Sequence, residues 1–458
     1  MLINLKQNNF NIEVDLPLSK SESNRALMIA FYLETQRRRD AETQRLCDFA
    51  TLRLCDFITL QLSDSDDTVL LKNLLDKINQ YIYHYKQSQL SVDCCPLTLD
   101  CANAGTVFRF LMTAVASLQL TINNEKSFEV FRFSDSQILS FLLTGNERMK
   151  QRPIDSLVEA LRSLGVSIEY TERESYPPVL IRPHNIEGGR VEVNVEQSSQ
   201  FASSLLLAAP LWKNGLELHL TGNISSLPYI DMTINMMKRC GIDVIRKDRY
   251  ILVKPGNYNI DNIKIEPDWS AAAFWYEIAA LSEYSDIFLK NLNIDSLQAD
   301  SVAIKMFENL GVETISVKEG VIIRNTTFNS QLLTFNFKNC PDLFPSVIAT
   351  CAGIKVNATF TGLKNLSIKE SDRKKAMMIE LKKINVSFEE ISDDELKMIC
   401  PEELPFFTEE KPIIFNNYND HRIAMALSIL SIKIGAIEMK NTEVVSKSYP
   451  NFFETVGY

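Results

Sequence analysis

The chain has 458 residues, of which 45% are hydrophobic and 23% are charged, and its formal net charge is -10. This composition is ordinary for a soluble globular protein, and the length predicts two or three domains. The acidic balance argues against broad binding to nucleic acid or to an anionic membrane, because both require a basic surface. An anion site in this chain would therefore need a local concentration of Lys and Arg.

Strand-like and helix-like segments alternate along the chain, which predicts an α/β fold. β-Branched and aromatic residues at period two predict strands at 10–14, 191–195, 216–220, 250–253, 321–323 and 333–337. Helices are expected at 26–33, 107–118, 156–164, 201–211, 271–281, 302–310 and 423–434. Gly165 and Gly311 follow two of these helices and Gly241 follows a further helical segment that ends at Cys240, and Gly suits the left-handed position after a helix. The similar layout of 157–170, 232–253 and 302–323 predicts an internally repeated architecture.

A tandem duplication interrupts this pattern near the N-terminus. The residues 34–37 recur as 42–45, and 45–52 recur almost unchanged as 53–60, with a spacing of eight residues. This spacing matches no solenoid repeat. We interpret 34–60 as an expanded surface connection, with a partner-binding arm as the alternative, because loops tolerate insertions at modest entropic cost.

Two further features bear on the compartment of the protein. The residues 1–17 lack the apolar core of a signal peptide, and no apolar run approaches the roughly 20 residues of a membrane-spanning helix. The nine cysteines form no paired CxxC motifs, so we expect reduced thiols and no metal site. These features predict a cytoplasmic protein.

Short loops rich in hydroxyl, amide and cationic side chains precede several predicted helices. They lie at 19–25, 103–109, 198–200, 369–373 and 419–422. A helix N-terminus attracts phosphate and carboxylate, because its N–H groups are unpaired and the helix dipole is positive there. Each loop alone could be a plain helix cap, and a lone His such as His421 is more often structural than catalytic. Several such loops in one acidic chain indicate a site that collects anions.

Taken in order, these segments resemble the family of 5-enolpyruvylshikimate-3-phosphate synthases, the 3-phosphoshikimate 1-carboxyvinyltransferases of the shikimate pathway. The matching segments span almost the whole chain: 16–27, 103–109, 143–153, 198–211, 226–231, 267–273, Asp342, 365–373, 418–425 and 447–453. The resemblance implies an α/β fold of two similar domains, each of three βαβαββ units, the enolpyruvyl transferase fold or inside-out α/β barrel. Domain I would contain 1–18 and 266–458, and domain II would contain 19–265.

The resemblance also implies a reaction and its residues. The enolpyruvyl group of phosphoenolpyruvate would pass to the 5-hydroxyl of shikimate 3-phosphate by addition and elimination, without a cofactor or metal. The catalytic groups would be Asp342, Glu370 and Lys20. The residues that bind phosphoenolpyruvate would be Lys20, Gly105, Arg148, Gln200, Arg373, Arg422 and Lys447. Those that bind shikimate 3-phosphate would be Lys20, Ser21, Arg25, Ser198, Ser199, Gln200, Ser226, Tyr229, Asp342, Asn365 and Lys369.

The chain departs from the family pattern at Leu18 and Ala102, where Gly is common, and at Phe110, where Pro is frequent. None of these positions holds an implied catalytic group, so activity is expected, while Phe110 leaves the response to the family inhibitor glyphosate open. Two alternatives also stay open. One is the sister transferase acting on UDP-N-acetylglucosamine, which usually carries a Cys in a loop where 144–153 has none. The other is a non-catalytic anion-binding relative.

The expected partners are the two small-molecule substrates, without nucleic acid or membrane, and we expect a monomer. The absence of HExxH, GxSxG, GxGxxG and Walker motifs from the sequence disfavours zinc proteases, serine hydrolases, dinucleotide-binding proteins and P-loop proteins.

Overall fold

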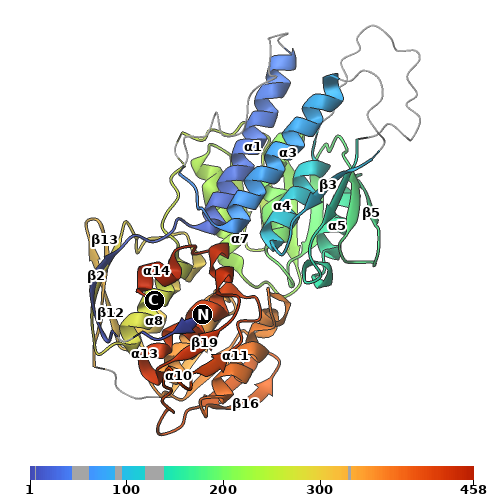
Figure 1. The fold of residues 1–458 in the computed structure, drawn as a ribbon. Coiled ribbons are helices and arrows are strands. Elements are labelled where there is room, and N and C mark those ends of the chain that lie inside the picture. Colours follow the sequence, from blue (N-terminus) through green and yellow to red (C-terminus); the bar gives the residue numbers. More distant parts are fainter. Residues whose placement is uncertain (6, 44–60, 88–94, 119–138, 262, 328–331) are drawn as a thin grey trace, which may run out of the picture. The chain divides into compact units, whose positions relative to one another are not determined.

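The computed structural model describes residues 1–5, 7–43, 61–87, 95–118, 139–261, 263–327 and 332–458. The chain divides into two compact units (Figure 1). Unit 1 comprises Met1–Lys20, Leu62–Asp66 and Ile265–Tyr458, and unit 2 comprises Ser21–Gln61 and Asp67–Lys264. The sequence-based domain boundaries at residues 19 and 266 remain a prediction.

Unit 2 contains two copies of one βαβαββ order. The first copy is β3 (Leu97–Asp100), α4 (Gly105–Ala116), β4 (Phe141–Thr144), α5 (Asp155–Ser163), β5 (Ser167–Tyr170) and β6 (Val179–Arg182). The second is β7 (Gly189–Asn194), α6 (Gln200–Ala208), β8 (Leu216–Thr221), α7 (Leu227–Arg239), β9 (Val244–Lys247) and β10 (Tyr250–Val253). The sheet orders are β3-β4-β6-β5 and β7-β8-β10-β9. In each sheet the first two strands are parallel and the final hairpin is antiparallel. The long helices α1 (Lys20–Thr43) and α3 (Asp66–Gln87) precede these copies.

Unit 1 repeats the same order twice. One copy is β2 (Asn9–Val14), α8 (Trp269–Leu281), β11 (Tyr284–Lys290), α9 (Ala303–Glu308), β12 (Val312–Val317) and β13 (Gly320–Asn325). The other is β14 (Leu333–Asn336), α10 (Phe344–Gly353), β15 (Ala358–Thr361), α11 (Arg373–Lys382), β16 (Ser387–Ser392) and β17 (Glu395–Ile399). The sheet orders are β12-β13-β11-β2 and β14-β15-β17-β16. Strand β2 pairs in parallel with β11 although unit 2 lies between them in the sequence.

A smaller sheet completes unit 1. It has the order β1-β19-β18 and contains β1 (Leu2–Ile3), β18 (Ile413–Phe415) and β19 (Ile437–Met439). The helices α12 (His421–Ile429), α13 (Ser431–Ile434) and α14 (Phe452–Val456) belong to the same part of the chain. The predicted α/β architecture with repeated βαβαββ units is confirmed, since the described residues contain four complete copies, two in each unit.

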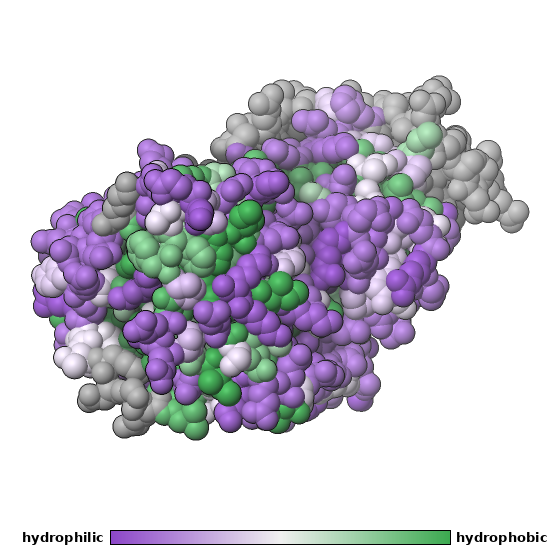
Figure 2. Space-filling model, turned by 60° about the horizontal axis from the view of Figure 1, so that its bottom comes forward, coloured by the Kyte–Doolittle hydropathy of each residue, from purple (hydrophilic) through white to green (hydrophobic). Residues whose placement is uncertain are grey.

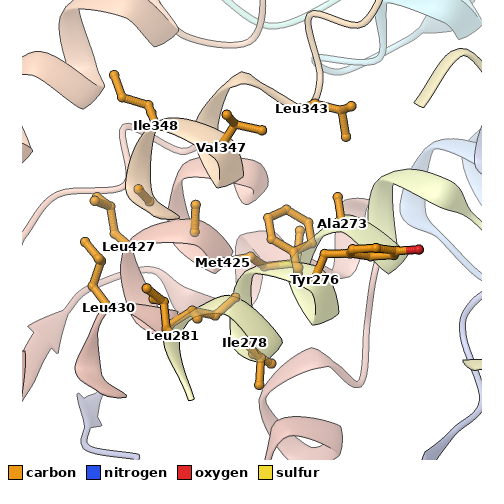
Figure 3. Packing of buried hydrophobic residues seen from close by; sticks show 14 of the residues in the cluster. Ala273, Tyr276, Ile278, Leu281, Leu343, Val347, Ile348, Met425, Leu427 and Leu430 are labelled. Atoms are coloured by element: carbon orange, nitrogen blue, oxygen red, sulfur yellow. The ribbon is translucent and has the colours of Figure 1, made fainter. Parts of the chain in front are cut away.

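Buried helices form the core of unit 1. Helix α10 is buried along its whole length, as expected for a helix that is apolar on all sides. Figure 3 shows side chains of α8, α10 and α12 in one cluster, among them Tyr276, Val347 and Met425. Because apolar packing fixes these helices, the polar residues at their N-terminal ends are held in defined positions.

Most of the predicted elements are confirmed within two residues. The six predicted strands coincide with β2, β7, β8, β10, β13 and β14. The three glycines after helices have left-handed backbones, with φ of 90° at Gly165, 87° at Gly241 and 81° at Gly311. The helix predicted at 26–33 is longer, since α1 continues to Thr43.

The longer helix α1 corrects the interpretation of 34–37 as part of a surface connection. Gln36 is 5% exposed, donates to the Gly256 carbonyl at 2.7 Å and accepts from the Tyr258 N–H at 3.1 Å. Glu34 is also buried. Gln36 and Glu34 therefore pack inside unit 2. Buried polar side chains of this kind are held by hydrogen bonds. Of the other duplicated residues, 42 and 43 end α1, and 44–60 lie outside the described part of the chain.

Figure 2 shows one face of the molecule, on which hydrophilic residues predominate and hydrophobic residues form smaller groups. Among the described helices, none is long and apolar enough to cross a membrane. The described cysteines, such as the buried Cys240 and Cys351, are free thiols.

Candidate functional site

Three helices of unit 1 begin at an aspartate that caps the helix. Asp268 precedes α8 and accepts hydrogen bonds from the N–H groups of Ser270 and Ala271 at 2.8 and 3.1 Å. Asp372 caps α11, and Asp420 caps α12 by accepting from the Arg422 N–H at 3.1 Å. An aspartate at this position satisfies N–H groups that the helix leaves unpaired. Local capping chemistry thus places charged groups at the ends of rigid helices.

Arg373, at the start of α11, joins the capping carboxylate of Asp420 to the carboxylate of Asp342 in a largely buried ion network. Its Nη1 donates to Asp342 Oδ1 at 2.6 Å, and its Nε donates to Asp420 Oδ2 at 2.8 Å. Arg422 Nη2 donates to the other Asp342 oxygen at 3.0 Å. Arg373 is 1% exposed and Asp420 is 0% exposed. Burial would raise the pKa of Asp342, but Arg422 and Arg373 hold that pKa well below its usual range.

Glu370 forms a second cluster with His421 and Lys447. Lys447 Nζ lies 3.3 Å from Oε1, and His421 Nδ1 lies 2.8 Å from Oε2 without the alignment of a hydrogen bond. Burial would raise the pKa of Glu370, but His421, Lys447 and Lys20 lower it well below the usual range. Burial also lowers the pKa of His421. Since His421 is then mostly neutral near pH 7, we regard the two lysines as the cations that keep Glu370 ionised.

Asp300 lies near this network and was not predicted from the sequence. It is 3% exposed, and its Oδ2 accepts a hydrogen bond from the Ser270 hydroxyl. Its buried Oδ1 has no hydrogen-bond partner. Burial, and then the negative charge of Asp342, raise the pKa of Asp300 to about 7. Unit 1 therefore holds carboxyl groups with very different affinities for a proton, which is a property of acid–base sites.

In unit 2, Arg25 is buried and its guanidinium group is hydrogen-bonded within the unit. Its Nε donates to Thr233 Oγ1 at 2.7 Å, and its terminal nitrogens donate to the carbonyls of Ser21 and Tyr229 at 2.8 and 3.1 Å. The guanidinium carbon lies 5.7 Å from the centre of the Phe110 ring. Burial lowers the pKa of Arg25 to about 10. Through these hydrogen bonds Arg25, on α1, is linked to Tyr229 and Thr233 of α7.

A second group in unit 2 lies at the start of α4. Arg109 Nη1 donates to the Gly105 carbonyl at 2.9 Å, and Gln200 Nε2 donates to Thr106 Oγ1 at 2.7 Å. Arg109 lies over the Phe201 ring at 5.4 Å. Burial lowers the pKa of Arg109 well below its usual value, and the neighbouring Arg152 lowers it further.

The other predicted site residues lie at turns and helix starts. Ser198 Oγ accepts from the Gln200 N–H at 3.2 Å, and Ser199 is buried before α6. Ser226 precedes α7 with a left-handed φ of 56°. Arg148 precedes a short 3₁₀ turn at Met149–Gln151 of unit 2. In unit 1, Asn365 and Lys369 belong to the turn at Lys364–Ile368 and its C-cap.

Although the polar loops at 103–109 and 419–422 contain three of them, the predicted catalytic and binding residues leave out several charged residues of these clusters: Arg109, Arg152, Asp300, Asp420 and His421. The sequence did contain a signal for the last two, because they begin an apolar helix beside Arg422. Among the described residues, Glu370, Asp420 and His421 offer ligand atoms within 4.8 Å of one another, as a metal site would. Lys447 and Arg373 already contact the two carboxylates, and these cations would compete with a metal ion.

Comparisons with known proteins show the family and the fold of the chain. The family model of EPSP synthase (3-phosphoshikimate 1-carboxyvinyltransferase) matches residues 5–456. A 3-phosphoshikimate 1-carboxyvinyltransferase from Bacteroides fragilis is 35% identical, with 96% of this chain and 93% of the relative covered. One from Sulfurovum sp. is 30% identical, with 97% and 95% covered. A solved structure of EPSP synthase from Acinetobacter baumannii has a TM-score of 0.67 at 20% identity, covering 99% of this chain and 97% of that chain, and shares the fold.

Proposed function

Because this chain belongs to the EPSP synthase family, we propose that it transfers the enolpyruvyl group of phosphoenolpyruvate to the 5-hydroxyl of shikimate 3-phosphate. The products are 5-enolpyruvylshikimate 3-phosphate and inorganic phosphate, in the pathway to chorismate and the aromatic amino acids. The observation that carries the proposal is the family match over almost the whole chain. The carboxylate, arginine and lysine clusters of unit 1 supply groups that suit this chemistry.

The reaction requires both a base and an acid. The 5-hydroxyl loses its proton as its oxygen attacks C2 of phosphoenolpyruvate, and C3 gains a proton, which gives a tetrahedral ketal. The ketal then expels phosphate while C3 loses a proton, which restores the double bond. Cations are needed as well, because the substrate carries a phosphate and a carboxylate and the leaving phosphate gains charge.

We assign the proton transfers to Asp342, Glu370 and Lys20. Both carboxylates have lowered pKa values, so each begins as a base. Asp342 would be strengthened as a base by phosphoenolpyruvate itself, because an anion that draws Arg373 and Arg422 away removes the charges that lower the pKa of Asp342. Glu370 has to gain a proton before it can deliver one, and Lys447 lies 3.3 Å away as a donor.

The binding residues follow the same reasoning. We propose that Arg373, Arg422 and Lys447 bind the anionic groups of phosphoenolpyruvate, because planar guanidinium forks suit carboxylate and phosphate. Gly105, Arg148, Gln200 and Lys20 are the further residues proposed for this substrate. For shikimate 3-phosphate we propose Ser21, Arg25, Ser198, Ser199, Gln200, Ser226, Tyr229, Asn365 and Lys369, with Lys20 and Asp342.

A single assay separates this function from its alternatives. The purified protein is mixed with phosphoenolpyruvate and shikimate 3-phosphate, and the release of inorganic phosphate and the mass of the product are measured. We expect both, and we expect no phosphate release when UDP-N-acetylglucosamine replaces shikimate 3-phosphate. Release with UDP-N-acetylglucosamine alone would support the sister transferase, and no release with either acceptor would support the anion-binding relative.

We also propose a cytoplasmic monomer with domain I at 1–18 and 266–458 and domain II at 19–265. Size-exclusion chromatography with light scattering tests the monomer. A mass near twice the 52.2 kDa of one chain would contradict it.

A further inference from the structure

Three aspartates of unit 1 lie close enough to Arg422 to act on its charge. Burial lowers the pKa of Arg422, but Asp342, Asp300 and Asp268 raise it. Asp268 accepts hydrogen bonds from three backbone N–H groups, at distances of 2.8, 3.1 and 3.2 Å. Asp342 accepts from the guanidinium groups of Arg373 and Arg422. Hydrogen bonds from N–H groups and nearby cations both favour the ionised carboxylate, so Asp268 and Asp342 carry negative charge.

Asp300 differs from the other two aspartates, because its hydrogen bonds compensate a negative charge poorly. It is 3% exposed, its Oδ2 accepts from the Ser270 hydroxyl, and its buried Oδ1 has no hydrogen-bond partner among the described residues. The Ser270 N–H donates to Asp268 at 2.8 Å, so one serine joins two buried carboxyl groups. A buried charge without a cation or N–H donor is costly, and such a group takes up a proton instead. The proton belongs on Oδ1, since Oδ2 already accepts a hydrogen bond.

The surroundings of Asp300 connect its proton to the charge of Arg422. The groups that face Asp300 are Asp342, Arg422, Asp268, the Ser270 hydroxyl and the Cys340 thiol. Burial raises the pKa of the thiol, which therefore stays neutral. Burial, and then Asp342, raise the pKa of Asp300 to about 7, whereas Arg422 favours the ionised form. An anion that binds Arg422 neutralises this cation and adds negative charge, so Asp300 would keep its proton to a higher pH.

We propose that Asp300 takes up a proton when an anion binds Arg422, which prevents an excess of negative charge in this part of unit 1. The proton passes from water to Oδ1, and no bond of the ligand changes. The choice of ligand rests on the proposed function, in which Arg422 binds the anionic groups of phosphoenolpyruvate. Asp300 is a positioning residue, because it acts on the substrate through Arg422.

The test compares wild type with Asp300→Asn at pH 6 and at pH 8. Asparagine has nearly the same shape and is neutral at both pH values, so it reproduces the protonated side chain. At pH 6 the wild type is mostly protonated too, and the KM for phosphoenolpyruvate should be nearly equal in the two proteins. At pH 8 the wild type must first gain a proton, so its KM should be about five- to tenfold higher than that of Asp300→Asn, given a pKa of about 7 before binding. Phosphate release at saturating shikimate 3-phosphate measures KM, and titration of the substrate itself affects both proteins alike.

Two further variants make the comparison specific. Asp286→Asn is the matched control, because Asp286 is an aspartate of unit 1 that pairs with Arg324 on β11, and the pH dependence of its KM should match that of the wild type. Ser270→Ala keeps Asp300 but removes the hydroxyl that favours its ionised form, so the rise of KM should move to higher pH. Melting temperatures at both pH values establish that each variant is folded.

A purely structural role of Asp300 predicts a different result. It would change KM by the same factor at pH 6 and pH 8, and this outcome in folded Asp300→Asn would overturn the proposal. Calorimetry of phosphoenolpyruvate binding in two buffers of different ionisation enthalpy counts the protons directly and needs no turnover. At pH 7.5 we expect the wild type to take up more protons than Asp300→Asn, and equal uptake would overturn the proposal. If the wild type releases no phosphate from the two substrates, the proposed function fails, while calorimetry still decides the role of Asp300.

Discussion

Both units bury arginines near helix N-termini, but the two units compensate the buried charge differently. In unit 1, Arg373 is held by the carboxylates of Asp342 and Asp420. In unit 2, the hydrogen bonds of Arg25 go to two carbonyls and a hydroxyl, and Arg109 donates to the Gly105 carbonyl. A network of opposite charges can hold and move protons without a ligand. Cations bound to neutral acceptors keep an attraction for anions, whereas an anion that binds Arg373 or Arg422 has to compete with the Asp342 carboxylate.

The largest effect is expected at Glu370 of unit 1, for which we propose a role in proton transfer. Glu370→Gln keeps the shape of the side chain but cannot exchange a proton, so kcat should fall roughly 10²–10⁴-fold while substrates still bind. Phosphate release measures turnover, and calorimetry measures binding.

A matched control is Glu380→Gln. Glu380 is a glutamate of unit 1 that is buried, whereas Glu370 is partly exposed, and Glu380 contacts Lys383 and Tyr418 rather than the proposed catalytic groups. Its replacement should leave kcat close to wild type. Near-normal turnover in Glu370→Gln would remove Glu370 from the mechanism.

The next largest effect is expected on the free energy of unfolding, and it tests whether the ion network around Arg373 stabilises unit 1. Arg373→Met leaves Asp342 and Asp420 without their shared cation, and breaking a buried ion pair by removing one partner costs about 3–5 kcal/mol. Urea unfolding at pH 7 measures the loss. An unchanged free energy of unfolding would show that the network does not stabilise unit 1.

Local sequence patterns predicted much of the fold, for physical reasons that can be named. Alternating apolar residues marked β8 and β10 almost to the residue, because one face of each strand is buried. The parallel pairing of β2 with β11 was not predictable in this way. It joins strands that the whole of unit 2 separates, and no local pattern encodes a partner at that distance.

The candidate site was likewise predictable only where its features are local in the sequence. Polar loops before apolar helices predicted where charged residues gather, because capping is a local interaction. The end point of a long side chain is a tertiary property: nothing in the sequence near Arg25 indicates that its guanidinium reaches the Tyr229 carbonyl. Asp300 gave no local signal either, and its raised pKa depends on burial and on Asp342. The roles of the predicted site residues stay predictions.

Asp300 provides a pH-dependent test within unit 1. Its pKa of about 7 in the folded state lies above the value of about 4 expected in the unfolded chain. The folded protein therefore holds an extra proton on Asp300 between these values, and the contribution of Asp300 to stability falls as the pH rises through that range. Asp300→Asn keeps an acceptor for Ser270 but cannot ionise, so it should remove about 2–3 kcal/mol of the loss between pH 5 and pH 8. Parallel pH profiles for the two proteins would contradict the assignment.

The smallest effect is expected at Arg25, and it tests the unit 2 side of the comparison. Arg25→Met leaves the Thr233 hydroxyl and the carbonyls of Ser21 and Tyr229 without a donor, and it removes the contact with the Phe110 ring. These hydrogen-bond acceptors are neutral, and the negative charge of Glu22 raises the pKa of Arg25 less than burial lowers it, so the loss should be about 1–3 kcal/mol, smaller than for Arg373→Met. Thr233 Oγ1 also donates to the Tyr229 carbonyl at 2.9 Å, which leaves one of the acceptors partly satisfied. Urea unfolding of the two variants under identical conditions gives the comparison directly. If Arg25→Met costs as much as Arg373→Met, the buried arginine of unit 2 is compensated as fully as that of unit 1, and the contrast between the units is wrong.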